Sequence, residues 1–242
     1  PHYYRGRKNG ESESQFCDRI IENLEKLILK EDPETIAAFI AEPVGGASGV
    51  VVAPDNYFPR VENLLTKHDI MMWSDEVICG FGRTGNNFGC ETMGFTPKLI
   101  SLAKQLSSAY LPISASVIPE YMHEAMIEPS SKVGVFGHGY TYTGHPAACA
   151  AALKTLEIYQ RDKLFEHAAD MGEYLQNKLN EFKNHPLVGE VRGRGLIGAV
   201  ELVANKETGE AFSDLAVGAH AKQACQDNGL LVRAVGGNSI AF

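Results

Sequence analysis

The sequence predicts an α/β protein built on a mostly parallel sheet with helices on both faces. Short, continuous apolar runs alternate with longer stretches in which apolar residues recur at helical spacing. In addition, Glu42, Asp75 and Lys104 each come directly after such an apolar run. Ligands of these sheets bind beyond the carboxyl ends of the strands. The three residues are therefore expected to share one site.

The first half of the chain predicts two helices and four strands. Residues 14–30 carry apolar side chains on one helix face, and Asp55 can cap a second helix that reaches about His68. The apolar runs that predict buried strands span residues 35–41, 70–74, 99–103 and 113–118. Gly80–Gly85 lacks the order of a phosphate-binding loop, so we interpret it as a tight structural loop.

The second half predicts a smaller α/β domain. Pro146 can begin a helix after Gly144. The elements expected after it are a helix over residues 164–182, strands over 188–191 and 196–203, a helix from Asp214 to a stop at Gly229, and a strand over 230–235. We expect residues 1–157 to be part of a large domain and residues 158–242 part of a small C-terminal domain. The chain opens on Pro1 and closes in a strand-like run, so we expect a fragment that lacks both ends.

The composition argues against several classes of protein. The net charge of -8 disfavours nucleic acid or an anionic membrane as a partner. No apolar run approaches the ~18 residues of a membrane span. The five cysteines lie far apart, so we expect reduced thiols in the cytoplasm rather than disulfides or zinc. No metal site is expected at His138 and His145, because no further ligand lies near them in the sequence.

Asp75 and Lys104 are the pair on which the functional hypothesis depends. Alone, Asp75 could cap a turn, and most single lysines lie on the surface. At the ends of buried strands, desolvation would instead make the amine nucleophilic, and the carboxylate would face a cationic partner. An amine that forms a Schiff base and a carboxylate that keeps a pyridine nitrogen protonated are what a pyridine-aldehyde cofactor requires. Glu76, beside Asp75, is expected to be solvated or to cap a helix.

Several motifs together resemble the signature of the class III pyridoxal-phosphate aminotransferases. The strongest are Met72–Val77, Leu99–Lys104 and Ser107–Tyr110, with a matching separation between Asp75 and Lys104. Ala41–Pro43, Gly80–Gly85, His138–Pro146 and Val191–Leu196 extend the resemblance over nearly the whole chain. It implies fold-type I architecture, bound pyridoxal 5'-phosphate, and ping-pong transfer of an amino group from a primary amine or amino acid to an oxo acid such as pyruvate.

The resemblance also assigns roles to individual residues. Lys104 would be the Schiff-base lysine and would then move a proton at the substrate Cα. Asp75 would pair with the pyridinium nitrogen, Val77 would pack on one ring face, and Glu42 would orient the cofactor through hydrogen bonds.

A second set of residues resembles a phosphate contact between subunits. Thr141 and the backbone around Tyr140 would contact the cofactor phosphate of a neighbouring subunit, which implies a homodimer with shared active sites. From the residues alone, the segment from His138 to Pro146 is equally consistent with a β-turn of exposed threonines.

Three residues depart from the pattern. Lys98 stands where aspartate is usual, and Gln105 follows Lys104 where glycine is commoner. Ala47 stands where ornithine- and γ-aminobutyrate-type members place a glutamate, which favours the ω-amine:pyruvate type. The family's phosphate cup is expected before Pro1 and its substrate arginine beyond Phe242. The alternatives are a diaminopelargonate-forming transaminase, a racemase or aminomutase, a non-catalytic fragment, or an α/β binding module of unrelated chemistry.

Overall fold

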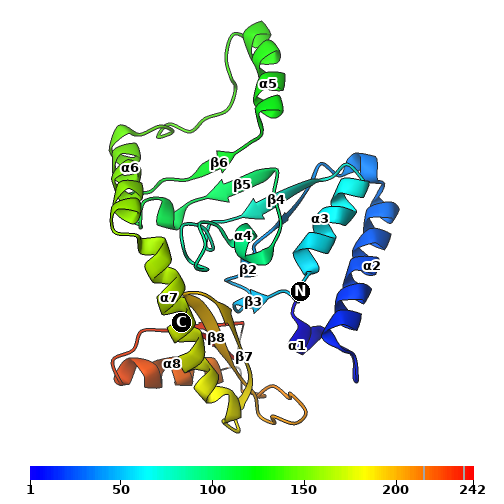
Figure 1. Cartoon of the computed structure of the whole chain (residues 1–242), viewed down its shortest axis with the longest axis vertical. Coiled ribbons are helices and arrows are strands. Elements are labelled where there is room, and N and C mark those ends of the chain that lie inside the picture. Colours follow the sequence, from blue (N-terminus) through cyan, green and yellow to red (C-terminus); the bar gives the residue numbers. More distant parts are fainter. Residues whose placement is uncertain (215, 237) are drawn as a thin grey trace.

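The computed structural model describes residues 1–242 except residues 215 and 237. Two four-stranded sheets lie at different levels along the long axis of the molecule, and helices of the second half of the chain run between them (Figure 1). None of the helices in the part of the chain that the structure describes is long and apolar enough to cross a membrane.

The larger sheet is mostly parallel, as predicted. Its strand order is β1 (Ala38–Ala41), β4 (Met71–Asp75), β5 (Leu99–Leu102) and β6 (Ala115–Val117). The first three strands run parallel and β6 is antiparallel. Ala41 lies opposite Ser74, and Asp75 lies opposite Ser101, so the carboxyl ends of β1, β4 and β5 meet at one edge.

Helices α2 (Glu13–Glu31) and α3 (Tyr57–Lys67) pack against one face of this sheet (Figure 1). Ser12 and Gln15 form a capping box that begins α2. The expectation that Asp55 caps α3 is wrong: the cap position is Asn56, in the left-handed conformation and without a side-chain hydrogen bond. Helix α3 begins one residue later than the sequence suggests, and the carboxylate of Asp55 accepts a hydrogen bond from Arg194 at 3.4 Å.

The strands are shorter and less buried than their apolar runs suggest. Residues Pro33–Thr35 form a 3-10 turn, η1, so β1 begins only at Ala38. Phe39 and Met72 pack into the core below α2 and α3, while Ile40, on the opposite face, is 54% exposed. Side chains alternate between the faces of a strand, and α2 and α3 cover only one of them.

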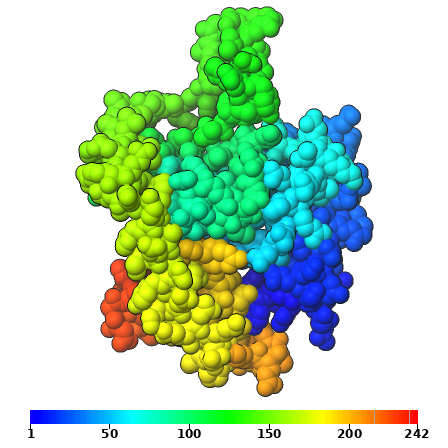
Figure 2. Space-filling view, in the orientation of Figure 1, coloured from blue at the N-terminus to red at the C-terminus, as the bar shows by residue number. Residues whose placement is uncertain are grey.

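Three further segments surround this sheet. A short helix, α4 (Gly89–Met93), follows the glycine-rich loop. Helix α5 (Glu120–Val133), which the sequence analysis did not identify, projects from the body and buries none of its residues (Figures 1 and 2). Helix α6 (Pro146–Arg161) begins at Pro146 as predicted, so the predicted domain boundary after residue 157 lies within its last turn.

The second half of the chain forms an antiparallel sheet. Helix α7 (Leu164–Asn180) packs on β7 (Val188–Arg194) and β8 (Ile197–Leu202), close to the predicted positions. The strand order is β7, β8, β10 (Ser239–Ala241) and β9 (Arg233–Val235). Helix α8 (Val217–Asp227) starts later than predicted, although Asp214 accepts a hydrogen bond from the N–H of Ala216. The short elements are α1 (Tyr3–Gly6), β2 (Val44–Gly45), β3 (Val51–Val52), η2 (Lys104–Leu106) and η3 (Glu181–Asn184).

The glycine-rich loop joins the two halves, which confirms its interpretation as structural. Leu196 donates its N–H to the carbonyl of Arg83 at 2.9 Å. A Cβ at Gly195 would lie 2.5 Å from the carbonyl carbon of Thr84, a distance that no side chain tolerates. Glycine is therefore required where the turn between β7 and β8 meets the loop.

Arg192 forms a second connection between the halves. Its buried guanidinium contacts the carboxylates of Glu190 at 2.8 Å and Glu201 at 2.5 Å. It also donates to the carbonyls of Gly49 and Val50, at 2.6 and 3.2 Å, in the turn between β2 and β3. One arginine thus fastens the small sheet to the loop that follows Glu42.

Candidate active site

The sheet brings three of the predicted site residues to one edge. Glu42 follows β1, Asp75 is the last residue of β4, and Lys104 lies two residues beyond β5. Because β1, β4 and β5 are parallel neighbours in this order, their carboxyl ends lie side by side. The prediction that all three residues lie at the carboxyl ends of strands is confirmed, and their sharing one site stays a prediction.

Asp75 is half-buried and has one carboxylate oxygen available. Its Oδ1 accepts a hydrogen bond from the N–H of Val77 at 3.1 Å, which begins the turn after β4. Oδ2 has no hydrogen-bond partner among the described residues. The side chain is therefore held in orientation by its own turn and can accept a further donor from a ligand. Val77, also half-buried, lies in the first turn position after the strand.

Lys104 has an exposed side chain and a strained backbone. Its φ is +38°, in the left-handed region that residues with a Cβ rarely occupy. In the part of the chain covered by the structure, its Nζ makes neither an ion pair nor a hydrogen bond. The desolvation expected from the apolar run is not found, because Lys104 lies past the end of β5, where no described element covers it.

Glu42 is held by its own loop. Its Oε2 accepts the N–H of Gly46 at 2.9 Å. Gly46 lies against the side chain of Ile78, since a Cβ at this position would lie 2.4 Å from Cδ1 of Ile78. Ile78 belongs to the turn that follows Asp75, and the loops after β1 and β4 are therefore packed against each other.

Glu76 is a buried residue whose importance the sequence analysis missed. It is 0% exposed and accepts the N–H groups of Gly89 and Cys90, both at 2.8 Å, and the hydroxyl of Ser74 at 2.9 Å. It therefore caps the N-terminus of α4, which agrees with one of its two expected roles, while the expectation of a solvated side chain is wrong. The only signal in the sequence was its position beside Asp75, because the two backbone N–H groups that it accepts lie 13 and 14 residues away.

Two buried cysteines near this edge are unsuited to nucleophilic chemistry. Burial raises the pKa of the Cys79 thiol to about 12, and burial together with the nearby Glu76 raises the pKa of Cys90 to about 12. Both thiols therefore stay protonated at neutral pH, and thiolate chemistry is excluded at these two positions.

Within residues 1–214, 216–236 and 238–242, no hydrogen bond or strand pairing joins Tyr140 or Thr141 to the strand ends. They lie on the segment between α5 and α6, where Tyr140 is 81% exposed and Thr141 is also exposed. The N–H of Tyr140 donates to Oγ1 of Thr143 at 2.8 Å, and Thr143 returns its N–H to the carbonyl of Tyr140 at 2.9 Å. The turn is thus closed on itself, and its contact with a neighbouring subunit stays a prediction.

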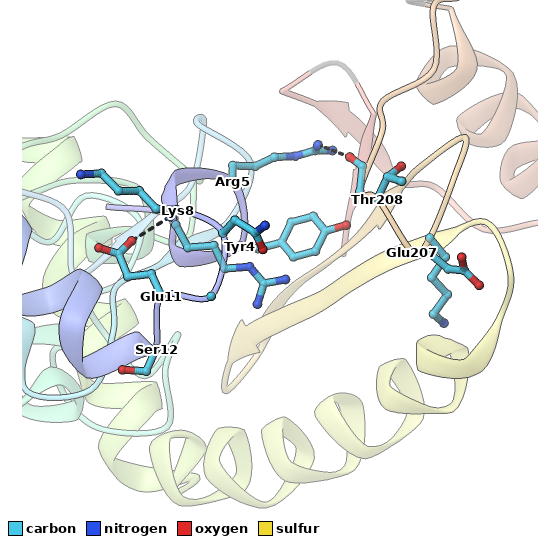
Figure 3. A pocket seen from close by; sticks show the side chains of 12 residues that line it. Tyr4, Arg5, Lys8, Glu11, Ser12, Glu207 and Thr208 are labelled. Carbon is cyan, nitrogen blue, oxygen red and sulfur yellow. Dashed lines mark hydrogen bonds between the residues drawn. The ribbon is translucent and has the colours of Figure 1, made fainter.

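A separate cleft of about 760 Å³ lies between the N-terminal segment and the turn that follows β8 (Figure 3). Tyr4 reaches across toward this turn, and Arg5 donates to the carbonyl of Gly209 at 2.7 Å. Burial raises the pKa of Tyr4. Glu42, Asp75 and Lys104 do not line this cleft, so it is distinct from the candidate site.

The groups at the sheet edge fit pyridoxal phosphate by their chemistry. A primary amine without a partner suits the aldehyde, and a carboxylate with a free oxygen suits the protonated pyridine nitrogen. They are carried by adjacent strands, with Asp75 opposite Ser101 and Lys104 three residues further along. The assignment of these residues to the cofactor stays a prediction.

Comparisons with known proteins identify the family of this chain. The family model for class III aminotransferases matches residues 3–242. "Gamma aminobutyrate transaminase 3, chloroplastic" of Solanum lycopersicum is 46% identical over 98% of this chain and 46% of its own length. "Vanillin aminotransferase" of Capsicum frutescens is 44% identical over 98% of the chain and 52% of its own length. The chain spans about half the length of the curated relatives it matches.

Solved structures of transaminases have the same fold as this chain. One described as "Transaminase with L-ala" superposes with a TM-score of 0.97 at 49% sequence identity. The match covers 100% of this chain and 57% of the chain in that structure. The omega transaminase of Pseudomonas jessenii in complex with PMP has a TM-score of 0.96 at 47% identity, with 100% and 53% coverage. The predicted fold-type I architecture and the family's cofactor, pyridoxal phosphate, are thereby confirmed. The chain belongs to the class III aminotransferases.

Proposed function

We propose that this chain carries the lysine and aspartate of an aminotransferase site that moves an amino group from a primary amine or amino acid to an oxo acid. The observation that carries the proposal is the pairing of a free amine on Lys104 with a half-buried carboxylate on Asp75 at the ends of adjacent parallel strands. Membership in the class III family supports the same reaction.

Each residue at the sheet edge has a defined part in this proposal. When bound, pyridoxal phosphate supplies an electron sink for the bonds of the substrate Cα. Lys104 would hold it through Nζ and would move a proton at the substrate Cα. Asp75 accepts a hydrogen bond from the ring nitrogen and keeps it protonated. Val77 packs on one face of the ring, and Glu42 orients it from the neighbouring loop.

The proposed substrates are an amine donor and an oxo-acid acceptor of the pyruvate type. Ala47, at the turn between β2 and β3, cannot form the ion pair that a glutamate at this position would make. Both γ-aminobutyrate transaminases and omega transaminases are among the relatives. Ala47 favours the omega type, because the glutamate that pairs with an arginine admitting a second carboxylate in ornithine- and γ-aminobutyrate-type members is absent here.

The proposed assembly is a cytoplasmic homodimer with shared active sites. Residues 1–157 belong to its large domain and residues 158–242 to its small domain, and Tyr140 and Thr141 serve the phosphate site of the neighbouring subunit. The exposed apolar side chains between α5 and α6 support an interface there, with Val135 at 61% and Phe136 at 53% exposure. A monomer in sedimentation velocity at micromolar concentration would contradict the dimer.

The amine of Lys104 gives a direct test. The chain is incubated with pyridoxal phosphate, reduced with borohydride and analysed by peptide mass spectrometry, with alanine formation from pyruvate and an aromatic amine measured in parallel. We expect the label on Lys104, loss of label and of alanine in Lys104→Ala, and retention of both in the control Lys98→Ala. A label spread over exposed lysines, without alanine formation, would refute the proposal.

A further inference from the structure

The turn that carries Lys104 contains an unusual concentration of left-handed residues. Lys104, Ser108 and Ala109 have φ values of +38°, +49° and +61°, and none of them is glycine. This conformation places Cβ close to the following carbonyl, so it costs free energy for every residue that has a Cβ. A turn with three such residues needs restraint from its surroundings.

The first restraint is the side chain of Gln105. Its Nε2 donates to the carbonyl of Ile78 at 3.2 Å. Ile78 lies in the turn after Asp75, whereas Gln105 directly follows Lys104. The amide therefore joins the loop that orients the carboxylate to the loop that carries the amine.

The second restraint comes from α6 through Tyr159. Its hydroxyl donates to the carbonyl of Gln105 at 2.7 Å. The hydroxyl oxygen of Tyr159 also lies 2.7 Å from Oγ of Ser108. Because the only proton of the Tyr159 hydroxyl goes to Gln105, Ser108 must donate in this second bond. The turn is thus held at both of its ends by one tyrosine.

Gln105 makes a connection that stability alone does not explain. Its Oε1 is buried and has no hydrogen-bond partner within the described residues, although an unsatisfied buried carbonyl lowers stability. An uncharged amide can hold the loop of Lys104 against the loop of Asp75 without adding a charge near the amine. The unsatisfied Oε1 and the uncharged amide are both consistent with a residue whose role is to place the neighbouring loops.

We propose that Gln105 is a positioning residue that holds Lys104 in register with Asp75 by linking the two loops, with Tyr159 as its support. This inference rests on the proposed role of Lys104 in binding the cofactor. It also gives a physical role to the residue that departs from the family pattern directly after the lysine.

The test compares Gln105→Met, which keeps the length of the side chain but lacks the donor, with Gln160→Met. Gln160 is exposed on the same helix as Tyr159, and its side chain forms no hydrogen bond in the described structure. The first readout is amide hydrogen exchange of residues 104–109. We expect exchange about fivefold to tenfold faster in Gln105→Met, as for the loss of one hydrogen bond, and no change in Gln160→Met.

The second readout separates positioning from a general loosening of the fold. An amine-specific reagent labels Lys104 and the exposed Lys98 in competition at several pH values, and mass spectrometry gives the ratio of their rates. We expect Gln105→Met to change this ratio by about threefold or more, because the surroundings of Nζ change. Tyr159→Phe, which removes the support from α6, is expected to change both readouts in the same direction.

Unchanged exchange, or faster exchange with an unchanged labelling ratio, overturns the inference. Neither readout uses the cofactor. If borohydride traps no pyridoxal phosphate on Lys104 of the parent chain, the proposed function fails, while exchange and labelling still decide whether Gln105 positions the lysine.

Discussion

Replacing the buried Glu76 tests how the candidate site is supported. Glu76→Gln keeps the shape of the side chain but exchanges one carboxylate oxygen for an NH₂ group. That group would face the N–H of Gly89 or Cys90, both of which now donate to the carboxylate at 2.8 Å. Two donors then meet in a position from which water is excluded, since Glu76 is 0% exposed.

The expected magnitude follows from these contacts. One hydrogen bond to a charged acceptor is lost and one buried N–H is left without a partner, which costs about 2–3 kcal/mol. For a chain of 242 residues, this corresponds to a fall in Tm of roughly 4–12 °C. Glu76→Ala leaves both N–H groups and the Ser74 hydroxyl without an acceptor, and we expect a loss of about 3–6 kcal/mol.

Urea unfolding followed by the fluorescence of Trp73 measures these changes. Trp73 is the single tryptophan of the chain and lies in β4, and its Nε1 donates to Ser101 at 2.9 Å. The control is Glu124→Gln, an exposed position in α5 whose side chain makes no hydrogen bond within the described structure, and we expect a change within about 0.5 kcal/mol there. A loss in Glu76→Gln no larger than that of the control would show that the buried carboxylate does not support α4.

Three further predictions concern the ion pairs of the small sheet and the strained turn. Arg192→Met should lower the free energy of unfolding by about 3–5 kcal/mol in urea titrations. The substitution removes the ion pair between Arg192 and the buried Glu201, which then keeps only Arg5 as an arginine partner among the described residues. Although burial raises the pKa of Glu190, the hydrogen bond from His2 and the charge of Arg192 outweigh it and lower the pKa below its ordinary value of 4.5. The stability from this group is therefore complete above about pH 4.5 and is lost as the pH falls through the lowered pKa, and a parent profile without this acid loss would contradict the assignment. Ala109→Gly should raise the free energy of unfolding by about 0.5–1 kcal/mol in the same assay, since glycine adopts a φ of +61° without strain, and a destabilised variant would show that the turn is not strained there.

Local interactions explain why parts of the fold could be predicted from the sequence. Pro146 begins α6 because its fixed φ suits the first turn of a helix. The apolar residues of α7 recur at helical spacing and form one face, so the helix can be recognised from the sequence alone. Asp75 and Lys104 could be placed at strand ends because each follows an apolar run directly. These signals span a few residues, so the order of neighbours along the chain is enough to detect them.

Only the tertiary structure decided which polar groups are buried and what they contact. Arg192 reaches the carbonyl of Gly49, 143 positions away, and nothing near either residue in the sequence indicates the pair. Glu76 is buried because α4 folds back onto it, whereas Lys104 remains exposed although it follows an apolar run. The pattern of side chains along an element indicates which of its faces is apolar. Whether that face is buried, and which groups it contacts, depends on the element that covers it, and long-range packing decides which element that is.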